Sequence, residues 1–324
     1  MNNIKTHVQS QQSNEIDRKS YLSEISTRDA KWDYQRSAAQ SVSTIYSKKI
    51  RFTKLHERIE SCSNMLTFGN KIDRETGEIK LKLQSAYFCH VRNCPVCQWR
   101  KALRNTAKFF AKIPELETAF PTHRWVFLTL TVKNCDVSNL KSTIKSMNAG
   151  WQRMIQKSNW PAVGFVRTTE VTRNEKDGSA HPHFHCLLMV KPSYFAGHSY
   201  ITQAEWAKRW QESARLDYEP IVDVRAVKPK RTGQTIQAAV IETLKYATKV
   251  EDSFADNEWL YAITLQLHKT RFIATGGTLK GILSDEVSTD EMINTDAEAE
   301  ENLNEIEKAQ IVFSWQSNIR RYVK

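Results

Sequence analysis

The chain has 324 residues, of which 40% are hydrophobic, and a formal net charge of +11 at pH 7. This length can form one large domain with accessory segments, or two domains. No stretch approaches the roughly 18 apolar residues of a membrane span, and no apolar run follows the first lysine as in a secretory signal. We therefore expect a cytoplasmic protein whose basic surface binds an anionic partner, either a nucleic acid or a membrane surface.

The first 118 residues contain two predicted segments. Residues 1–29 are polar and rich in Ser, Gln and Asn, which predicts a disordered arm. Residues 30–118 predict an N-terminal helical and zinc-binding module, because a charged helical pattern leads into a cluster of cysteines. The basic helix Trp99–Lys112 follows the cysteines, and Pro114 is expected to end it.

Strand and helix patterns alternate in residues 119–283. The predicted strands are Trp125–Val132, Val163–Thr172, His183–Val190 and Ile221–Val227, and the predicted helices are Ser138–Gln156, Thr202–Leu216 and Gln234–Lys249. This order predicts an α+β fold in which a mostly antiparallel central sheet has its helices on one face.

The C-terminal residues 284–324 differ in charge from the rest of the chain. Between Ser284 and Glu307 there are ten Asp and Glu residues and no Lys or Arg, so the remaining chain is more basic than the total indicates. We expect an acidic linker, whose role the sequence leaves open, and a terminal helix over Ile306–Val323.

Two histidines on one predicted strand are the most informative feature. His183 and His185 are two residues apart, so their side chains point to the same sheet face, whereas Phe184 and Cys186 point to the other face, toward the core. Hydrogen bonding alone would explain a single histidine. Two imidazoles at this spacing favour a site for a divalent ion, for which Mn²⁺ and Mg²⁺ are both candidates.

The third ligand of this predicted metal site has two candidates. Glu170 lies on the strand that leads into the histidine hairpin and offers a carboxylate. His181 shares the strand parity of the two histidines, but Pro182 can interrupt the strand beside it. We therefore prefer Glu170 and keep His181 as the alternative.

The helix Gln234–Lys249 contains a candidate nucleophile. Residues four apart share a helix face, so Glu242 and Tyr246 are neighbours, and Lys249 lies one turn further on. A tyrosine with a pKa near 10 is a weak nucleophile that a metal-polarised phosphate and a nearby lysine would assist. Glu242 could activate a water or a hydroxyl in a later step. Taken alone, Glu242, Tyr246 and Lys249 would indicate an ordinary helix. Together with the histidine strand, they indicate a catalytic site.

Four cysteines predict a structural zinc site. Cys94 and Cys97 have the short spacing of a zinc knuckle, and Cys89 and Cys62 precede them. The first pair is widely spaced, so His90 is an alternative ligand, and buried thiols without metal are the competing interpretation.

Two basic clusters are candidate DNA contacts. The first lies on the helix that the zinc site would anchor, and the second lies in the loop before the tyrosine helix. A solvated surface would equally explain such residues. The candidates are Arg100, Lys101, Arg104, Lys228, Lys230 and Arg231.

Together these motifs resemble the HUH endonucleases, and among them the plasmid rolling-circle replication initiators more than relaxases or transposases. The similar segments are Phe127–Thr131, the His183-Phe184-His185 strand, Tyr246-x-x-Lys249, Arg271–Gly277 and the Cys-Pro-x-Cys run from Cys94. The pairing of Glu242 with Tyr246 is similar to the single-tyrosine branch, in which the glutamate serves in termination.

The resemblance implies both a fold and an activity. Residues 119–283 would be the HUH endonuclease domain, with a five-stranded antiparallel, palm-like sheet. The activity implied is a nick in one strand of a single-stranded or hairpin plasmid origin, with a 5′-phosphotyrosine link and a free 3′-hydroxyl. A host helicase is the protein partner that the family implies, and no membrane partner is expected.

Two other functions compete with nicking. A DNA-binding regulator would explain the charge and the cysteines but not the histidine strand. A metal-dependent hydrolase that uses water would explain the histidines but not Tyr246.

Overall fold

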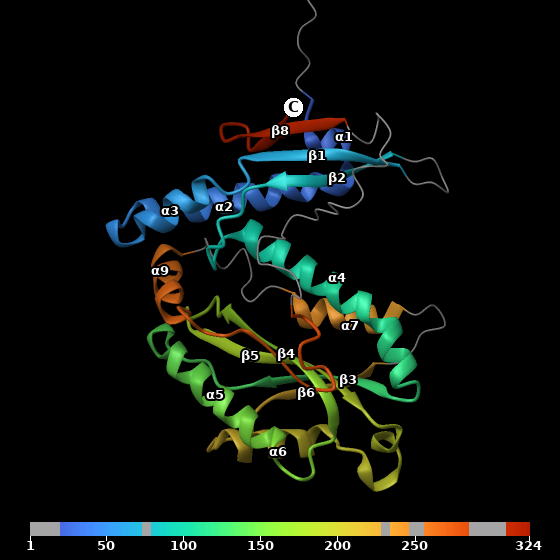
Figure 1. Ribbon diagram of the computed structural model, residues 1–324. Helices are drawn as coiled ribbons and strands as arrows, with labels where there is room; N and C mark the ends of the chain where they lie inside the picture. Colours follow the sequence, from blue (N-terminus) through green and yellow to red (C-terminus); the bar gives the residue numbers. More distant parts are fainter. Residues whose placement is uncertain (1–19, 73–78, 228–233, 246–255, 285–308) are drawn as a thin grey trace, which may run out of the picture.

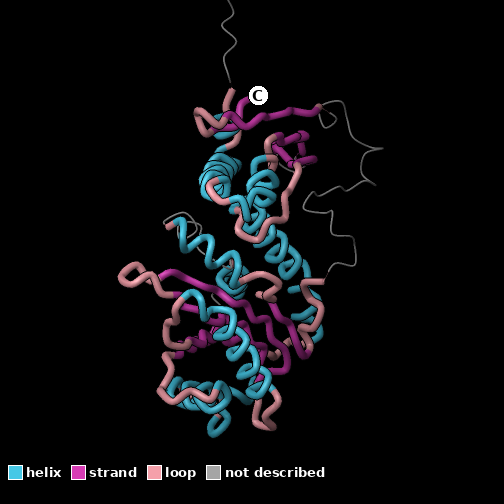
Figure 2. Tube along the Cα trace, turned by 90° about the vertical axis from the view of Figure 1, so that its left-hand side faces the viewer, coloured by secondary structure: helices cyan, strands magenta, loops and turns pink. Residues whose placement is uncertain are grey.

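The computed structural model describes residues 20–72, 79–227, 234–245, 256–284 and 309–324 (Figure 1). It contains two antiparallel sheets in separate parts of the molecule, each packed against helices (Figures 1 and 2). The α+β class expected from the sequence is confirmed. Among the described residues, no helix is both long and apolar enough to cross a membrane.

The larger sheet has five strands in the order β6-β3-β5-β4-β7, and all neighbours are antiparallel. Its strands are β3 (Arg124–Thr131), β4 (Ala162–Arg173), β5 (Ala180–Val190), β6 (Val222–Val227) and β7 (Ile273–Gly277). The residue patterns predicted four of them. The fifth, β7, lies in the segment that only the family resemblance singled out, because five residues with two glycines give no strong strand pattern.

Helices cover both faces of this sheet, so the prediction of helices on one face is wrong in that detail. On the central strand, Phe184 and Cys186 pack against α5 (Leu140–Ile155) and α6 (Gln203–Ala214). Leu187 and Met189 point to the other face, toward α4 and α7 (Gln234–Leu244). Because the side chains on both faces of β5 are apolar near its end, helices must cover both faces of the sheet there.

The long helix α4 (Pro95–Ala119) connects the two parts of the molecule (Figure 1). It continues past Pro114, contrary to the expected stop. A proline inside a helix removes one backbone hydrogen bond. Here Phe109 is fully buried and its ring lies 6.0 Å from that of Trp125, and partly buried Ile113 and Leu116 pack in the same cluster. This packing of the helix on the sheet offsets the lost hydrogen bond.

The smaller sheet joins the two ends of the chain in the order β2-β1-β8-β9. Its strands are β1 (Met65–Ile72), β2 (Ile79–Ala86), β8 (Gln310–Gln316) and β9 (Arg321–Val323). The expected terminal helix over Ile306–Val323 is therefore wrong where the structure describes it. Phe313 pairs with Leu66 and is fully buried, so the alternating pattern of this segment belongs to a strand with one buried face.

The N-terminal helices pack against the strand β9 of this sheet and against one another. They are α1 (Leu22–Ile25), α2 (Lys31–Ser47) and α3 (Thr53–Glu60), with short 3-10 turns η1 (Thr27–Ala30) and η2 (Ile50–Phe52). Residues 20–29 are thus folded rather than part of a disordered arm, because Leu22 is fully buried and Tyr21 forms a bridge with Val323. Residues 1–19 lie outside the described residues.

The helix α9 (Asn257–Gln266) holds the two parts together. Its Tyr261 hydroxyl donates to the carbonyl of Ile45 at 2.7 Å, and its Thr264 hydroxyl lies 2.6 Å from that of Tyr46. The remaining turns are η3 (Val137–Asn139), η4 (Pro192–Phe195) and η5 (Gly197–Ser199). The N-terminal part of the molecule and the central sheet are therefore fixed to one another by α4 and α9.

Candidate functional site

Three candidate metal ligands converge on neighbouring strands of the larger sheet. Glu170 of β4 pairs directly with His183 of β5, and His185 lies two residues along on the same face. The Glu170 Oε2 atom is 2.9 Å from His185 Nε2 and 3.5 Å from His183 Nε2. All three side chains are buried, and their ligand atoms lie within 4.8 Å of one another. The strand register therefore produces the cluster that the sequence predicted.

The rings are oriented by contacts to their second nitrogens. His183 Nδ1 lies 3.2 Å from the carbonyl oxygen of His181, which can only accept, so Nδ1 is the protonated nitrogen. His185 Nδ1 lies 3.3 Å from the Thr129 hydroxyl on β3. Both Nε2 atoms consequently face Glu170. Partners of this kind fix the ring orientation of metal-binding histidines.

The structure distinguishes between the two candidates for the third ligand. Glu170 contacts both histidines, whereas His181 Nδ1 lies 2.7 Å from the Asn134 amide oxygen. His181 stays outside the cluster, although its ring is 5.1 Å from that of His183. Two imidazoles and a carboxylate match the donor set that holds Mn²⁺ or Fe²⁺ and leaves positions open for substrate.

The Glu170 carboxylate is strongly stabilised in its charged form. Burial alone would raise the pKa of Glu170, but contacts with His183 and His185 and the charge of Lys245 hold that pKa well below its usual range. The Lys245 ammonium lies 3.7 Å from Glu170 Oε2. An ionised carboxylate between two imidazoles is suited to a divalent cation.

The helix α7 is fastened over this face of the sheet. The Thr168 hydroxyl donates to the carbonyl of Thr243 at 2.6 Å, and Val240 and Leu244 are buried in the same apolar cluster as Leu187. Glu242 is partly exposed, and its carboxylate forms an ion pair with the Arg225 guanidinium of β6 at an N–O distance of 3.4 Å. The C-terminal end of α7 therefore lies at the Glu170 cluster.

Several predicted site residues lie outside the described residues. Tyr246 directly follows Lys245, the last described residue of this segment, and Lys249 lies three residues further on. The loop residues Lys228, Lys230 and Arg231 also lie outside the part of the chain that the structure describes.

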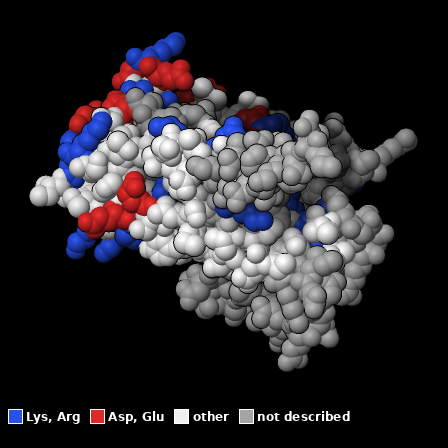
Figure 3. Space-filling model, turned by 90° about the horizontal axis from the view of Figure 1, so that it is seen from above, with Lys and Arg blue, Asp and Glu red and all other residues white. Residues whose placement is uncertain are grey.

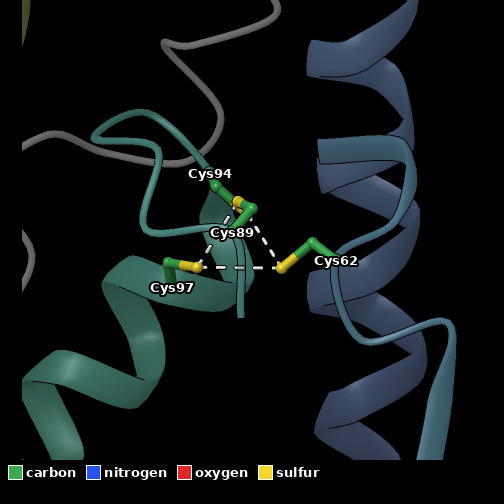
Figure 4. A group of neighbouring side chains, drawn as sticks. All are labelled: Cys62, Cys89, Cys94 and Cys97. Atoms are coloured by element: carbon green, nitrogen blue, oxygen red, sulfur yellow. Dashed lines mark hydrogen bonds between the residues drawn. The ribbon is translucent and has the colours of Figure 1, made fainter. Parts of the chain in front are cut away.

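Four cysteines form a second cluster, in which the side chains point toward one another (Figure 4). Cys62 follows α3, Cys89 follows β2, and Cys94 and Cys97 lie at the start of α4. The wide spacing of the first pair is explained by the β1-β2 hairpin, whose open end brings Ser63 N within 2.7 Å of the Tyr87 carbonyl. His90, the alternative ligand, is exposed.

The distances between these sulfur atoms fit a tetrahedral metal site. The sulfur atoms of three pairs, Cys62 with Cys94, Cys62 with Cys97 and Cys89 with Cys97, are 3.6 to 3.7 Å apart. A disulfide would require about 2.05 Å. A zinc ion with bonds of about 2.3 Å in a regular tetrahedron separates its sulfurs by about 3.8 Å. The four thiols are therefore spaced as the ligands of one tetrahedral metal ion would be.

The protonation of the thiols also favours a bound cation. Contacts with Cys89 and the other two thiols lower the pKa of Cys62, whereas burial raises the pKa of Cys94. Several thiolates this close together repel one another in the absence of a positive ion. A divalent ion would remove that repulsion and favour the deprotonated form of all four.

The predicted DNA-contacting residues of α4 have different surroundings. The Arg100 guanidinium is 5.3 Å from the Trp32 ring and 5.6 Å from the Trp99 ring, and burial lowers its pKa. Arg100 therefore packs within the module. Lys101 and Arg104 instead line a groove that also reaches Lys245.

Sequence reasoning missed three residues beside the site: Lys245, Arg225 and Thr129. Lys245 directly precedes Tyr246, so its proximity could have been suggested by position in the chain. The pairing of Arg225 with Glu242, and of Thr129 with His185, depends on strand and helix packing that no local pattern encodes.

The fold and the two clusters define an α+β protein whose described residues form two candidate metal sites. Residues 80–323 match the model of the Rep_1 family, described as replication protein. A relative named Protein rep from Lactiplantibacillus plantarum is 39% identical over 251 residues, which cover 74% of this chain and 77% of the relative. Protein rep of Streptococcus pneumoniae serotype 2 is 34% identical, and the match covers 79% of each chain.

A replication protein of Staphylococcus aureus is 40% identical over 190 residues, which cover 54% of this chain and 81% of the relative. No solved structure matches the chain. The chain belongs to the Rep_1 family of plasmid rolling-circle replication initiators, and its function lies in plasmid replication.

Proposed function

We propose that this protein nicks one DNA strand at a plasmid origin by covalent catalysis. The observation that supports this proposal is the Glu170, His183 and His185 cluster at the C-terminal end of α7, directly before Tyr246. In this mechanism, the Tyr246 hydroxyl attacks the scissile phosphorus and loses its proton. The P–O3′ bond breaks, the released 3′-oxygen takes up a proton, and the 5′-phosphate stays on Tyr246 as in the HUH endonucleases.

The two histidines and Glu170 would hold a divalent ion, Mn²⁺ or Mg²⁺. Bound there, such an ion would polarise the non-bridging phosphate oxygens and stabilise charge in the transition state. Lys245 places a second positive charge 3.7 Å from Glu170 Oε2. We propose that Lys245 and Lys249 stabilise the developing negative charge on phosphate and phenolate.

A second step would end replication without a second tyrosine. We propose that Glu242 acts then as a general base toward a water molecule or a DNA hydroxyl. Its position supports this role, because Glu242 precedes Tyr246 by four residues in the sequence and its side chain is 39% exposed. The ion pair with Arg225 orients the Glu242 carboxylate in the resting protein.

The cysteine cluster would bind a structural Zn²⁺ ion. All four thiols are buried, so no open position remains for a substrate or a water molecule. This ion would fix the N-terminal end of α4 and with it the basic residues of that helix.

The decisive experiment is a denaturing gel of the protein with a labelled single-stranded or hairpin origin oligonucleotide, with and without added Mn²⁺. We expect a metal-dependent protein–DNA adduct that survives denaturation and is absent for Tyr246→Phe. Cleavage without an adduct would support a water-using hydrolase instead. Binding of a verified origin without cleavage would support a DNA-binding regulator.

A further inference from the structure

A groove of about 950 Å³ runs between the zinc module and the central sheet. One wall is formed by the loop before α4 and the first turns of α4. The other wall is formed by the end of α7, the strand β7 and the turn that follows it. Thr168 and Thr169 line the groove next to Glu170, so the groove leads to the candidate metal ligands.

The charges on the groove are of one sign. The described residues that line it include six cations and no Asp or Glu. These cations come from both walls: Arg92, Lys101 and Arg104 on the module side, and Lys245, Arg271 and Lys280 on the sheet side. By contrast, acidic and basic side chains alternate on the left-hand part of the upper surface (Figure 3). The net positive charge of the protein is therefore not spread evenly.

Packing holds these cations close together. Arg92 donates to the Thr270 carbonyl at 2.7 Å, and its guanidinium lies 4.6 Å from the Phe272 ring, which connects the two walls. Partial burial and the neighbouring charges of Arg92 and Arg104 lower the pKa of Lys101. Like charges at such proximity destabilise the protein unless an anion compensates them. The groove is thus suited to a chain of negative charges.

The size of the groove favours a single strand over a duplex. Its volume lies at the upper end of the range for small-ligand pockets, which is enough for a few nucleotides. Positive grooves that follow the phosphate backbone are the usual means of binding single strands without sequence preference.

We propose that this groove binds the sugar-phosphate backbone of single-stranded DNA and leads it to Glu170, His183 and His185, with the zinc module as one wall. This proposal rests on the nicking function proposed above. It assigns to Lys101 and Arg104 of α4, and to Lys280 after β7, contacts with DNA phosphates. It also gives the cysteine cluster a role in DNA binding, because Arg92 is two residues from Cys94.

The test measures non-covalent binding in a full-length Tyr246→Phe background. A fluorescein-labelled, mixed-sequence single strand of about 20 nucleotides is titrated by anisotropy at several salt concentrations. Each phosphate contact in a single strand contributes about 0.7 to the slope of log affinity against log salt. For Lys101→Ala/Arg104→Ala we expect that slope to fall by about 1.4 and the affinity at 0.1 M salt to fall about 20-fold.

The matched control is Lys145→Ala/Lys208→Ala, which removes two exposed lysines from α5 and α6 on the opposite face of the sheet. This variant should bind the single strand within about twofold of the parent protein. A Lys101/Arg104 variant with the affinity and slope of the parent would overturn the proposal. So would a duplex of the same sequence that competes as strongly as the unlabelled single strand.

Zinc content and Tm will show whether the substitutions on α4 disturb folding. A second variant tests the groove independently of α4. Lys280→Ala alters the opposite wall at an exposed turn and should lower the slope by about 0.7. If the folded Lys280→Ala variant binds the single strand with the affinity and salt slope of the parent protein, the groove proposal is wrong. The wild-type adduct assay is independent of this result. If the wild-type protein forms the adduct but the groove variants bind DNA like the parent, only the groove proposal is rejected. If the groove variants lose binding but the wild-type protein forms no adduct, only the nicking function is rejected.

Discussion

Glu170 Oε2 lies 2.9 Å from His185 Nε2, and the two residues come from adjacent strands that are joined by a hairpin. The same oxygen is 3.5 Å from His183 Nε2. A single carboxylate thus faces both imidazoles, which is the arrangement that a shared cation requires. The contacts of His183 and His185 with other groups decide which ring nitrogens face the site.

The first prediction concerns metal affinity. His185→Ala removes a ligand and should weaken Mn²⁺ binding by more than about 100-fold, whereas Thr129→Val removes only the hydroxyl beside His185 Nδ1 and should weaken it about tenfold. Isothermal titration with Mn²⁺ measures both effects on protein that holds one zinc ion per chain and is free of excess zinc. The matched control is His181→Ala, since His181 lies on the same strand but outside the cluster. A loss for His181→Ala as large as for His185→Ala would contradict the ligand set.

The second prediction separates initiation from termination. Glu242→Gln keeps the shape of the side chain but removes the base, so termination should slow by about 100-fold or more while initial nicking stays within about threefold. Quenched-flow assays with a labelled origin and a labelled acceptor strand measure the two steps. Glu219→Ala, an exposed acid in the loop before β6, serves as the control. Equal loss of both steps in Glu242→Gln would show that Glu242 acts already in nicking.

The sequence predicted the parts of this protein in which local spacing determines geometry. On β5, alternation places His183 and His185 on one face, and the hairpin register then adds Glu170. Cys94 and Cys97 were recognised by the same kind of local spacing. Contacts between distant segments could not be predicted in this way. Arg225 reaches Glu242 only because β6 and α7 pack together, and Phe313 joins β1 from the other end of the chain.

The errors have a related physical cause. Pro114 was expected to end α4, but burial of the surrounding apolar residues against the sheet outweighs the local helix penalty. A helix was also predicted for Ile306–Val323, but the described part of this segment contains the strand β8. Its strand conformation is stabilised by pairing with β1, which lies more than two hundred residues earlier.

The third prediction concerns the cysteine cluster. Cys97→Ser should abolish stoichiometric zinc binding and lower stability by at least about 3 kcal/mol, or roughly 6–12 °C in Tm. Mass spectrometry under native conditions and thermal melts measure the two effects. Cys135→Ser is the control, because Cys135 is half-buried and outside the cluster. Full zinc retention in Cys97→Ser would rule out the four-thiolate site.

The fourth prediction tests whether β8 is an integral strand of the N-terminal module. Phe313 is fully buried against Phe68, with ring centroids 5.9 Å apart, whereas its neighbour Val312 is 40% exposed on the other face of β8. Phe313→Ala should therefore lower the free energy of unfolding by about 3–5 kcal/mol, and Val312→Ala by no more than about 0.5 kcal/mol. Urea denaturation followed by tryptophan fluorescence measures both. Because Tyr322 of β9 donates to the Ser63 carbonyl beside Cys62, the Phe313 variant should also release zinc at a lower urea concentration than the Val312 variant. Equal effects of the two substitutions would mean that β8 does not stabilise the module through a buried face.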